Sequence, residues 1–275
     1  MSRVAVVADS ACDLPRDAAR EAGIAVVPLN VTFGTTSYLD GVDITPAEFW
    51  ERVAQDHPTT SSPSPEAFLR AYRAQAEEGA EGVVSVHVSG ALSRTLFSAR
   101  KAAEASPVPV EVVDSGSVSL GQGLIALAAA EVSRAGEDLT TTAAAARAAA
   151  ERLTLAAMLE TVEFLKRGGR VGRARAAVAD LLRIRPVLTL DGGEPVLAAR
   201  ARTRSRAIAT VLELVSGEAL SAAVLHAQAG EAQAVAEGVA EACGVRPIVA
   251  EIGPVTGTHL GPGALGVAVI RPPID

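Results

Sequence analysis

Short runs of branched apolar residues alternate with alanine-rich stretches along most of this 275-residue chain. The apolar runs are too short for helices, whereas the stretches between them carry helical patterns. Continuous apolar strands that alternate with helices are typical of a mainly parallel sheet with helices on both faces. In the first half of the chain, strands are predicted at residues 3–8, 24–33, 82–88 and 110–114.

The helical patterns of the first half begin at recognisable signals. Proline occupies the first turn of three of them, where its missing N–H is not needed. Ser64, which precedes Pro65, is typical of an N-cap. Helices are predicted at residues 15–22, 46–54, 65–78, 92–105, 119–135 and 140–152.

The pattern changes after about residue 153. Residues 185–203 predict a hairpin with its turn at Asp191-Gly192-Gly193. A hairpin among alternating strands and helices favours a second domain with a mixed sheet. We therefore expect two α/β domains, residues 1–153 with the mainly parallel sheet and residues 154–275 with the mixed sheet. The other elements expected in the second domain are strands at 155–161, 221–227, 246–252 and 265–270 and helices at 204–215 and 230–242.

Composition limits the partners and the location of the protein. Hydrophobic residues make up 49% of the sequence but aromatic residues only 3%, so the core must be built of Val, Leu, Ile and Ala. A net charge of −7 argues against nucleic acid or an anionic membrane as a partner. The N-terminal segment lacks the pattern of a signal peptide, and no run reaches the ~18 apolar residues of a membrane span. We expect a cytoplasmic protein without integral membrane association.

Residue types that bind metals are sparse in this sequence. Cys12 and Cys243 form no C-x-x-C pair and predict no disulfide framework. His57, His87 and His226 stand alone, without the spacing of a zinc site. We therefore expect neither a metal nor another cofactor.

Polar residues follow the first predicted strand. Asp9 and Ser10 stand at its C-terminal end, where open α/β sheets bind their ligands. The structural alternative is that Ser10 or Asp13 caps the helix that opens at Pro15. A cap can also lie beside a site, so the two interpretations are compatible.

Two further segments carry hydroxyl side chains. Thr59, Thr60, Ser61 and Ser62 lie in an irregular run between two helices, either as an ordinary polar loop or as hydroxyl donors aimed at an anion. Ser89 and Ser93 bracket the turn before the helix predicted from residue 92. The free N–H groups of that helix terminus favour an anion, although Ser93 is equally suited to cap the helix.

Residues 164–186 form the one basic cluster of an acidic chain. They contain a single acidic residue, Asp180, so a solvated helix face explains the cluster less well than usual. An acidic partner or a phosphorylated ligand would be attracted to it. Its basic residues are Lys166, Arg167, Arg170, Arg173, Arg175, Arg183 and Arg185.

A single histidine, His259, lies in the segment GPVTGTHLGPGALGV, residues 253–267, among five glycines, two prolines and two threonines. Glycines allow the backbone to approach a ligand closely, and an imidazole donates a hydrogen bond in either protonation state. A structural histidine in a turn is the alternative.

Taken in order, several segments resemble the DegV family, and the resemblance covers essentially the whole chain. The chain departs from the usual family pattern at Gly90, where Ser is usual, and at Arg94, where Gly is usual. The segments that carry the resemblance are DS…DLP, VPLNVTF, TSSPSP, LSRT, VVDSGSVSLGQG, FLKRGGRV, RTRSRA and GPVTGTHLGPGALGV.

Members of this family bind long-chain fatty acids, and some are the carrier subunit of bacterial fatty acid kinase. The resemblance implies a protein that encloses an acyl chain such as palmitate, stearate or oleate and presents its carboxylate to a separate kinase subunit, without catalysis of its own. Thr60 and Ser93 match the carboxylate-binding motifs. His259, Arg170 and Arg202 match the conserved residues near the head group and the partner surface, and Arg173 joins the expected docking patch. Around the site we expect Asp9, Ser10, Ser61, Ser89 and Arg94.

Physical arguments agree with this implication. A buried methylene is worth ~0.8 kcal/mol, and an aliphatic interior suits an acyl tail. An enclosed carboxylate needs hydrogen-bond donors.

Two other functions remain open on the sequence. Ser93, His259 and Asp9 suit the nucleophile, base and orienting group of an esterase or thioesterase. The missing G-x-S-x-G motif argues against this enzyme. A subunit of a sugar or triose kinase is suggested by fold analogy alone.

Overall fold

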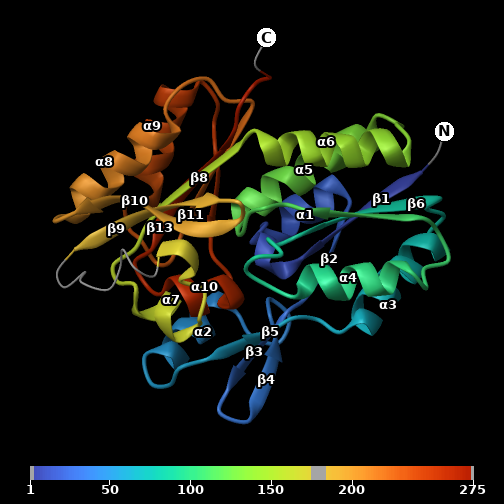
Figure 1. The fold of residues 1–275 in the computed structure, drawn as a ribbon, viewed down its shortest axis with the longest axis horizontal. Helices are drawn as coiled ribbons and strands as arrows, with labels where there is room; N and C mark the ends of the chain where they lie inside the picture. Colours follow the sequence, from blue (N-terminus) through green and yellow to red (C-terminus); the bar gives the residue numbers. More distant parts are fainter. Residues whose placement is uncertain (1–2, 175–183, 274–275) are drawn as a thin grey trace.

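The first half of the chain builds a four-stranded parallel sheet with the order β2-β1-β6-β7 (Figure 1). The computed structural model describes residues 3–174 and 184–273. Every residue of β1 and β6 is buried, as expected for strands covered on both faces. The strands of this sheet are β1 (Val4–Asp9), β2 (Ile24–Val27), β6 (Gly82–His87) and β7 (Val110–Asp114).

Helices cover both faces of the parallel sheet. On one face α3 and α4 pack over a core that contains Phe68 and Tyr72. On the other face α1, α5 and α6 pack against the strands. This arrangement confirms the fold class expected from the sequence. The helices are α1 (Arg16–Ala22), α3 (Pro65–Glu77), α4 (Thr95–Ala103), α5 (Leu120–Arg134) and α6 (Leu139–Glu151).

The second half builds a six-stranded mixed sheet with the order β10-β9-β8-β13-β11-β12. Among the described pairs of this sheet, β11 and β12 are parallel and the others are antiparallel. Helices α8 (Arg204–Val215) and α9 (Ala232–Cys243) pack over one face. The hairpin predicted around Asp191 is present as β9 and β10. The strands are β8 (Leu153–Met158), β9 (Arg185–Asp191), β10 (Glu194–Ala201), β11 (Ser221–His226), β12 (Ile248–Glu251) and β13 (Leu265–Ile270).

Helix α5 lies between the two sheets. It contacts β1 and β6 of the parallel sheet as well as β8, β11 and β13 of the mixed sheet. Nine of its 15 residues are buried, and a helix that is apolar on most sides is expected in such a position. The chain enters the mixed sheet at Leu153, and the boundary near residue 153 stays a prediction. The division into two domains stays a proposal.

The strand predicted over residues 24–33 is wrong as a single element. Pro28 and Leu29 separate β2 from β3 (Asn30–Phe33), and proline has no N–H to donate to a sheet. Strand β3 leaves the parallel sheet and forms a small antiparallel sheet with β4 (Thr36–Leu39) and β5 (Thr59–Ser61). This small sheet lies below the other two in the view of Figure 1, and its strand β5 contains Thr60.

Helix caps agree with the sequence in part. Ser64 caps α3 as predicted, accepting a hydrogen bond from the N–H of Ala67. Neither Ser10 nor Asp13 caps α1, whose N-cap is Pro15 and has no side-chain cap bond. The side chains of Ser10 and Asp13 instead contact other parts of the chain, Ser10 at Asp40 and Asp13 at Ser119.

The glycine-rich segment at residue 253 contains a short helix that the sequence pattern did not predict, α10 (Pro254–Leu260). It packs against α2 (Pro46–Val53) and α7 (Glu163–Arg167) and against the small sheet. Gly257 is required here, because a Cβ atom would lie 2.7 Å from the ring of Phe49. Helix α10 thus carries His259 into the space between the sheets.

No helix in residues 3–174 and 184–273 is long and apolar enough to cross a membrane.

Phe49 supports α10, so its truncation should destabilise the whole fold. The side chain is fully buried, with ring contacts to Phe33 and Trp50. We expect Phe49→Ala to lower the free energy of unfolding by about 3–5 kcal/mol, the usual range for a buried aromatic side chain. Phe97, which is 53% exposed, is the matched control, and Phe97→Ala should cost less than about 1 kcal/mol. Urea denaturation measures both, and equal losses would contradict the expectation.

Candidate functional site

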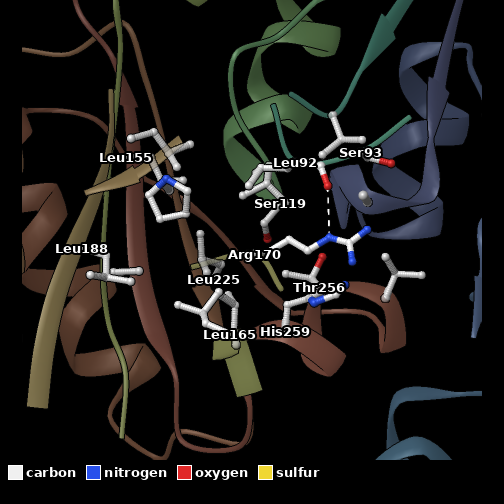
Figure 2. Close-up of a pocket in the computed structure, with 18 of the residues that line it drawn as sticks. Leu92, Ser93, Ser119, Leu155, Leu165, Arg170, Leu188, Leu225, Thr256 and His259 are labelled. Carbon is white, nitrogen blue, oxygen red and sulfur yellow. Dashed lines mark hydrogen bonds between the residues drawn. The ribbon is translucent and has the colours of Figure 1, made fainter. Parts of the chain in front are cut away.

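A cavity lies between the two main sheets and is closed on one side by α10 (Figure 2); its empty space, including solvent at its open side, is about 900 Å³. Its walls are mostly aliphatic, and among the described residues no aromatic side chain lines it. The leucines that line it are Leu29, Leu92, Leu155, Leu159, Leu165, Leu188, Leu190, Leu225 and Leu260.

Three residues predicted to bind a carboxylate meet at this cavity. Thr60 comes from β5, Ser93 from the turn before α4, and His259 from α10, and all three line the cavity. Thr60 Oγ1 and His259 Nε2 lie 2.9 Å apart. Ser93 Oγ is 3.1 Å from the hydroxyl of Ser62. The cavity therefore has hydroxyl and imidazole groups beside a leucine-rich wall.

The His259 ring is held neutral by its surroundings. Burial, with a smaller contribution from the charge of Arg170, lowers the pKa of His259 to about 4. Its Nδ1 atom is buried and has no hydrogen-bond partner among the described residues. Gly168 packs directly against this atom, because a Cβ at residue 168 would overlap it. A neutral imidazole can donate from one ring nitrogen and accept at the other.

Arg170 also lines the cavity, with its guanidinium held by backbone oxygens. Its Nε donates to the carbonyl of Leu92 at 3.2 Å (Figure 2), and one terminal nitrogen donates to the carbonyl of Gly168 at 2.6 Å. Within residues 3–174 and 184–273, no carboxylate forms an ion pair with it. The side chain is therefore a fixed cation whose charge is not neutralised by a described neighbour.

A polar groove adjoins the cavity. The two share Leu92, Ser93, Arg170 and Pro195 as lining residues. Arg94 lines the groove and not the cavity, and its guanidinium lies over the Phe97 ring at 5.4 Å. The groove therefore connects the hydroxyl end of the cavity with two arginines.

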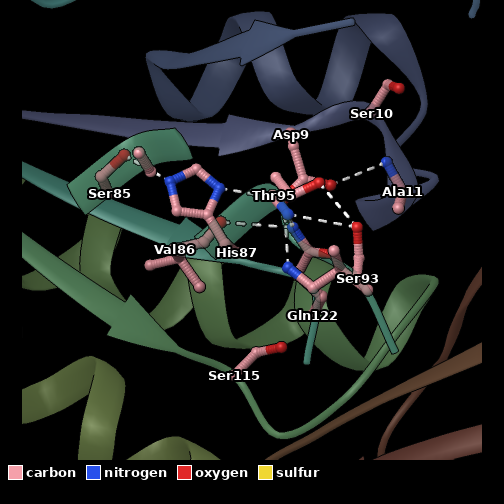
Figure 3. Close-up of polar contacts among 12 residues, drawn as sticks. Asp9, Ser10, Ala11, Ser85, Val86, His87, Ser93, Thr95, Ser115 and Gln122 are labelled. Atoms are coloured by element: carbon pink, nitrogen blue, oxygen red, sulfur yellow. Dashed lines mark hydrogen bonds and ion pairs between the residues drawn. The ribbon is translucent and has the colours of Figure 1, made fainter. Parts of the chain in front are cut away.

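Asp9 does not line the cavity. Figure 3 shows its carboxylate in a buried cluster, where it contacts His87 Nδ1 at 2.9 Å and accepts hydrogen bonds from Gln122 Nε2 and from the N–H groups of Ala11 and Val88. These four partners satisfy the buried carboxylate, so a structural role is sufficient to explain why Asp9 is there. Asp9 thus ties the end of β1 to β6 and α5.

The other residues expected near the site also lie outside the cavity lining. Ser10 donates to the carboxylate of Asp40 at 2.7 Å. Ser61 is exposed at the end of β5. Ser89 is buried and donates to the carbonyl of Gly193 at 2.9 Å, which joins the parallel sheet to the β9–β10 turn.

The esterase arrangement of Ser93, His259 and Asp9 is not assembled. His259 contacts Thr60, and Asp9 contacts His87. The hydrogen-bond order of a triad occurs instead at Ser85, His87 and Asp9, with Ser85 Oγ 2.7 Å from His87 Nε2. All three side chains are fully buried, so no ester can reach the Ser85 hydroxyl.

The arginines expected to dock a partner differ in their surroundings. Arg173 pairs with Asp191 at 2.6 Å on the surface. Arg202 is exposed in the connection between β10 and α8. Arg175 and Arg183 of the basic cluster lie outside the described residues, and Arg185 pairs with Glu160.

Three polar residues of the cavity were not predicted from the sequence: Ser119, Thr189 and Thr256. Ser119 precedes α5 with a backbone φ of 56°. The Thr256 hydroxyl is buried without a hydrogen-bond partner among the described residues. A usable signal for Thr256 is its place three residues before His259, which puts both on one helical face. In the described part of the chain, no group of three His, Cys, Asp or Glu side chains is arranged to hold a metal ion.

Comparisons with known proteins agree with this fold. Residues 3–272 match a family model described as "Uncharacterised protein, DegV family". A DegV domain-containing protein of Streptomyces coelicolor is 39% identical over 278 residues, covering 98% of this chain and 99% of the relative. The chain therefore belongs to the DegV family.

Two solved structures extend the likeness to three dimensions. A DegV family protein from Thermus thermophilus, described by its fatty acid binding, has a TM-score of 0.90 and 37% identity, with 98% of this chain and 100% of that one covered. A stearic-acid-binding protein from Eubacterium ventriosum has a TM-score of 0.88 and 26% identity, with 98% of both chains covered. Both share the fold described above.

The His259 ring should titrate with a pKa of about 4, because burial disfavours its charged form. The unfolded chain binds this proton first, so the contribution of the neutral ring to stability is lost as the pH falls from about 6.5 to 4. NMR of the ring protons from pH 3.5 to 8, assigned with His259→Gln, measures the pKa. Gly168→Ala should raise it, because the added methyl group displaces the ring. A value near 6.5 in the unsubstituted protein would contradict the buried position.

Proposed function

We propose that this protein binds a long-chain fatty acid, with the acyl tail between the leucines of the cavity and the carboxylate at Thr60, Ser93 and His259. The observation that carries the proposal is the pairing of a leucine-lined cavity with hydroxyl and imidazole groups on its wall. Related proteins of the same fold bind fatty acids, one of them stearic acid. Palmitate, stearate and oleate are the ligands that this chemistry favours.

The tail supplies most of the binding free energy in this proposal. At ~0.8 kcal/mol per buried methylene, a sixteen-carbon chain gains on the order of 10 kcal/mol before the cost of ordering is subtracted. Leucine side chains provide that burial without polar groups to desolvate. A bulky polar or aromatic ligand would find few partners on these walls.

The head group needs donors because a carboxylate cannot be enclosed unpaired. The hydroxyls of Thr60 and Ser93 donate to its oxygens, and the ligand replaces the contact that Thr60 makes with His259. A neutral His259 adds one more donor. Neutral donors hold the carboxylate without forming a tight ion pair, which leaves its oxygens available for a reaction.

We place a partner kinase at the adjoining groove. The groove joins Ser93 to Arg94 and Arg170, so an approaching phosphoryl group would meet positive charge beside the carboxylate. The protein acts as a carrier that presents the fatty acid, and the kinase supplies the catalysis. Arg173 and Arg202 extend the docking surface. The cytoplasmic location inferred from the sequence stays a prediction.

Protein purified from a bacterial host tests the identity of the bound ligand. Native mass spectrometry should show a bound mass in the C14–C18 fatty acid range, and organic extraction should release that acid. Phospholipid or sugar phosphate in its place would overturn the proposal. So would an empty protein that also fails to bind added palmitate.

Removing one head-group donor should weaken binding without unfolding the protein. Thr60→Ala and Ser93→Ala each delete a hydrogen bond to a charged oxygen, which is worth roughly 1.5–3 kcal/mol, or about ten- to a hundredfold in affinity. Displacement of a fluorescent fatty acid measures the affinity. Ser61→Ala, one residue from Thr60 and outside the cavity lining, is the matched control. Unchanged affinity in both site variants would place the carboxylate elsewhere.

Arg170 should matter for the kinase reaction more than for binding. We expect Arg170→Ala to keep fatty-acid affinity within about twofold, because tail burial dominates binding. Acyl-phosphate formation with the partner kinase should fall at least about tenfold, the size of one charge-assisted contact. Arg147→Ala on α6, a surface arginine paired with Glu111, is the control. Loss of fatty-acid binding in Arg170→Ala would assign the residue to the head-group site instead.

A further inference from the structure

Two buried side chains from distant parts of the sequence meet behind the cavity wall. Ser119 Oγ lies 2.5 Å from Asp13 Oδ2, within hydrogen-bond distance, and both side chains are buried. Each residue has a positive φ, 50° for Asp13 and 56° for Ser119. Such a conformation costs free energy for residues other than glycine and is often retained at functional sites.

Asp13 connects the two helices that border the polar side of the cavity. Ser119 immediately precedes α5, and the N–H of Gly253 immediately before α10 donates to Asp13 Oδ1 at 2.9 Å. Ser119 itself lines the cavity (Figure 2). The hydroxyl of Thr256 is close enough to lower the pKa of Asp13, although its oxygen reaches no hydrogen-bond geometry with a described group.

Asp13 is neutral at pH 7 in this environment. Burial raises its pKa to about 8, and the nearby carboxyl of Asp40 acts in the same direction. Burial raises the pKa of Asp40 to about 7 and raises that of Cys12, whereas that of His259 is lowered.

Other charged groups also lie near Asp13. Asp9 adds negative charge near Asp40 and Cys12. Arg16 and Glu251 line the outer groove that Asp13 also borders. At the α5 side the neighbours of Asp13 are uncharged.

The protonation of Asp13 decides where the Ser119 proton points. In the ionised form both Asp13 oxygens are acceptors, so Ser119 must give its single proton to Oδ2. In the neutral form the N–H of Gly253 occupies Oδ1, and the carboxyl proton therefore sits on Oδ2 and is donated to Ser119 Oγ. The Ser119 proton is then free to point into the cavity.

We propose that Asp13 is a proton-linked positioning residue for the fatty-acid head group. In its neutral form it turns the Ser119 hydroxyl toward the bound carboxylate, and in its ionised form it withdraws that donor and adds a negative charge behind the wall. This inference rests on the proposed function, because it needs an anionic ligand in the cavity. Binding is thereby coupled to proton uptake.

The sign of the coupling follows from linkage. A ligand that prefers neutral Asp13 raises the pKa of that residue on binding, so affinity is constant below the pKa of the free protein and falls above it. With titration near pH 8, affinity should be about tenfold lower at pH 9 than at pH 7. His259 titrates far below this range and does not contribute.

The first experiment uses the unsubstituted protein and dodecanoate, a soluble fatty acid, in calorimetry from pH 6 to 9. At pH 8.5, titrations in two buffers of different ionisation enthalpy should show uptake of about half a proton or more. Constant affinity with no proton uptake would overturn the coupling. Absence of dodecanoate and palmitate binding at every pH would instead refute the proposed function, so the two failures are distinct.

Variants then distinguish the effect of the Ser119 hydroxyl from simple repulsion between ionised Asp13 and the bound carboxylate. Asp13→Asn keeps an oxygen for Gly253 and an N–H for Ser119, so binding should stay strong and independent of pH. Ser119→Ala should lower affinity at pH 7 about tenfold and lose most of the pH dependence. Asp40→Asn is the control and should keep the pH dependence with its midpoint moved to lower pH, because the charge of Asp40 raises the pKa of Asp13. A full pH dependence in Ser119→Ala would show that charge alone acts and would overturn the role of Ser119. Thermal unfolding checks that each variant is folded.

Discussion

The burial of α5 between two sheets is the constraint on which the rest of the molecule depends. The helix contacts the parallel sheet through β1 and β6 and the mixed sheet through β8, β11 and β13. It therefore fixes the distance between the sheets along its length. Beyond its N-terminal end the sheets are no longer separated by a helix, and the cavity occupies that space with Val118 and Ser119 on its wall.

The chemistry of the cavity comes from segments that are far apart in the chain. Leucines from β8, β9 and β11 form one wall, whereas Thr60, Ser93 and His259 arrive from the small sheet, the turn before α4 and α10. Scarcity of aromatic residues and abundance of leucine suit an elongated aliphatic ligand. The polar groups beside this wall are neutral, with Arg170 as a cation fixed by backbone carbonyls. Such a site offers an apolar surface along its wall and hydrogen-bonding groups beside it.

Local patterns predicted the regular elements well. Helix α8 and strand β13 were predicted with the bounds that they have in the structure, because caps, turns and apolar runs define them locally. The strand over residues 24–33 was wrong since the effect of Pro28 was not weighed. Helix α10 was missed because its glycines and prolines are typical of turns, and it is stabilised by packing on Phe49 and Trp50 rather than by propensity.

The candidate site was less accessible to sequence reasoning. Thr60, Ser93 and His259 were suggested by resemblance to a family, and no local pattern joins them. The contact between Asp13 and Ser119 spans 106 positions. Aspartate adopts a positive φ more readily than most residues, but the serine side chain of Ser119 gives no such signal. Asp9 stands at the end of a strand where ligands often bind, yet the neighbouring strand supplies His87, which holds it in the core.

Trp50 gives the molecule an intrinsic optical probe. It is the one tryptophan in the sequence, and its indole N–H donates to Glu251 at 3.0 Å while its ring packs against Gly257 in the middle of α10. Tryptophan emission depends on the polarity and rigidity around the indole. The natural fluorescence of this protein therefore reports on the helix that carries His259, without a label and without interference from a second indole.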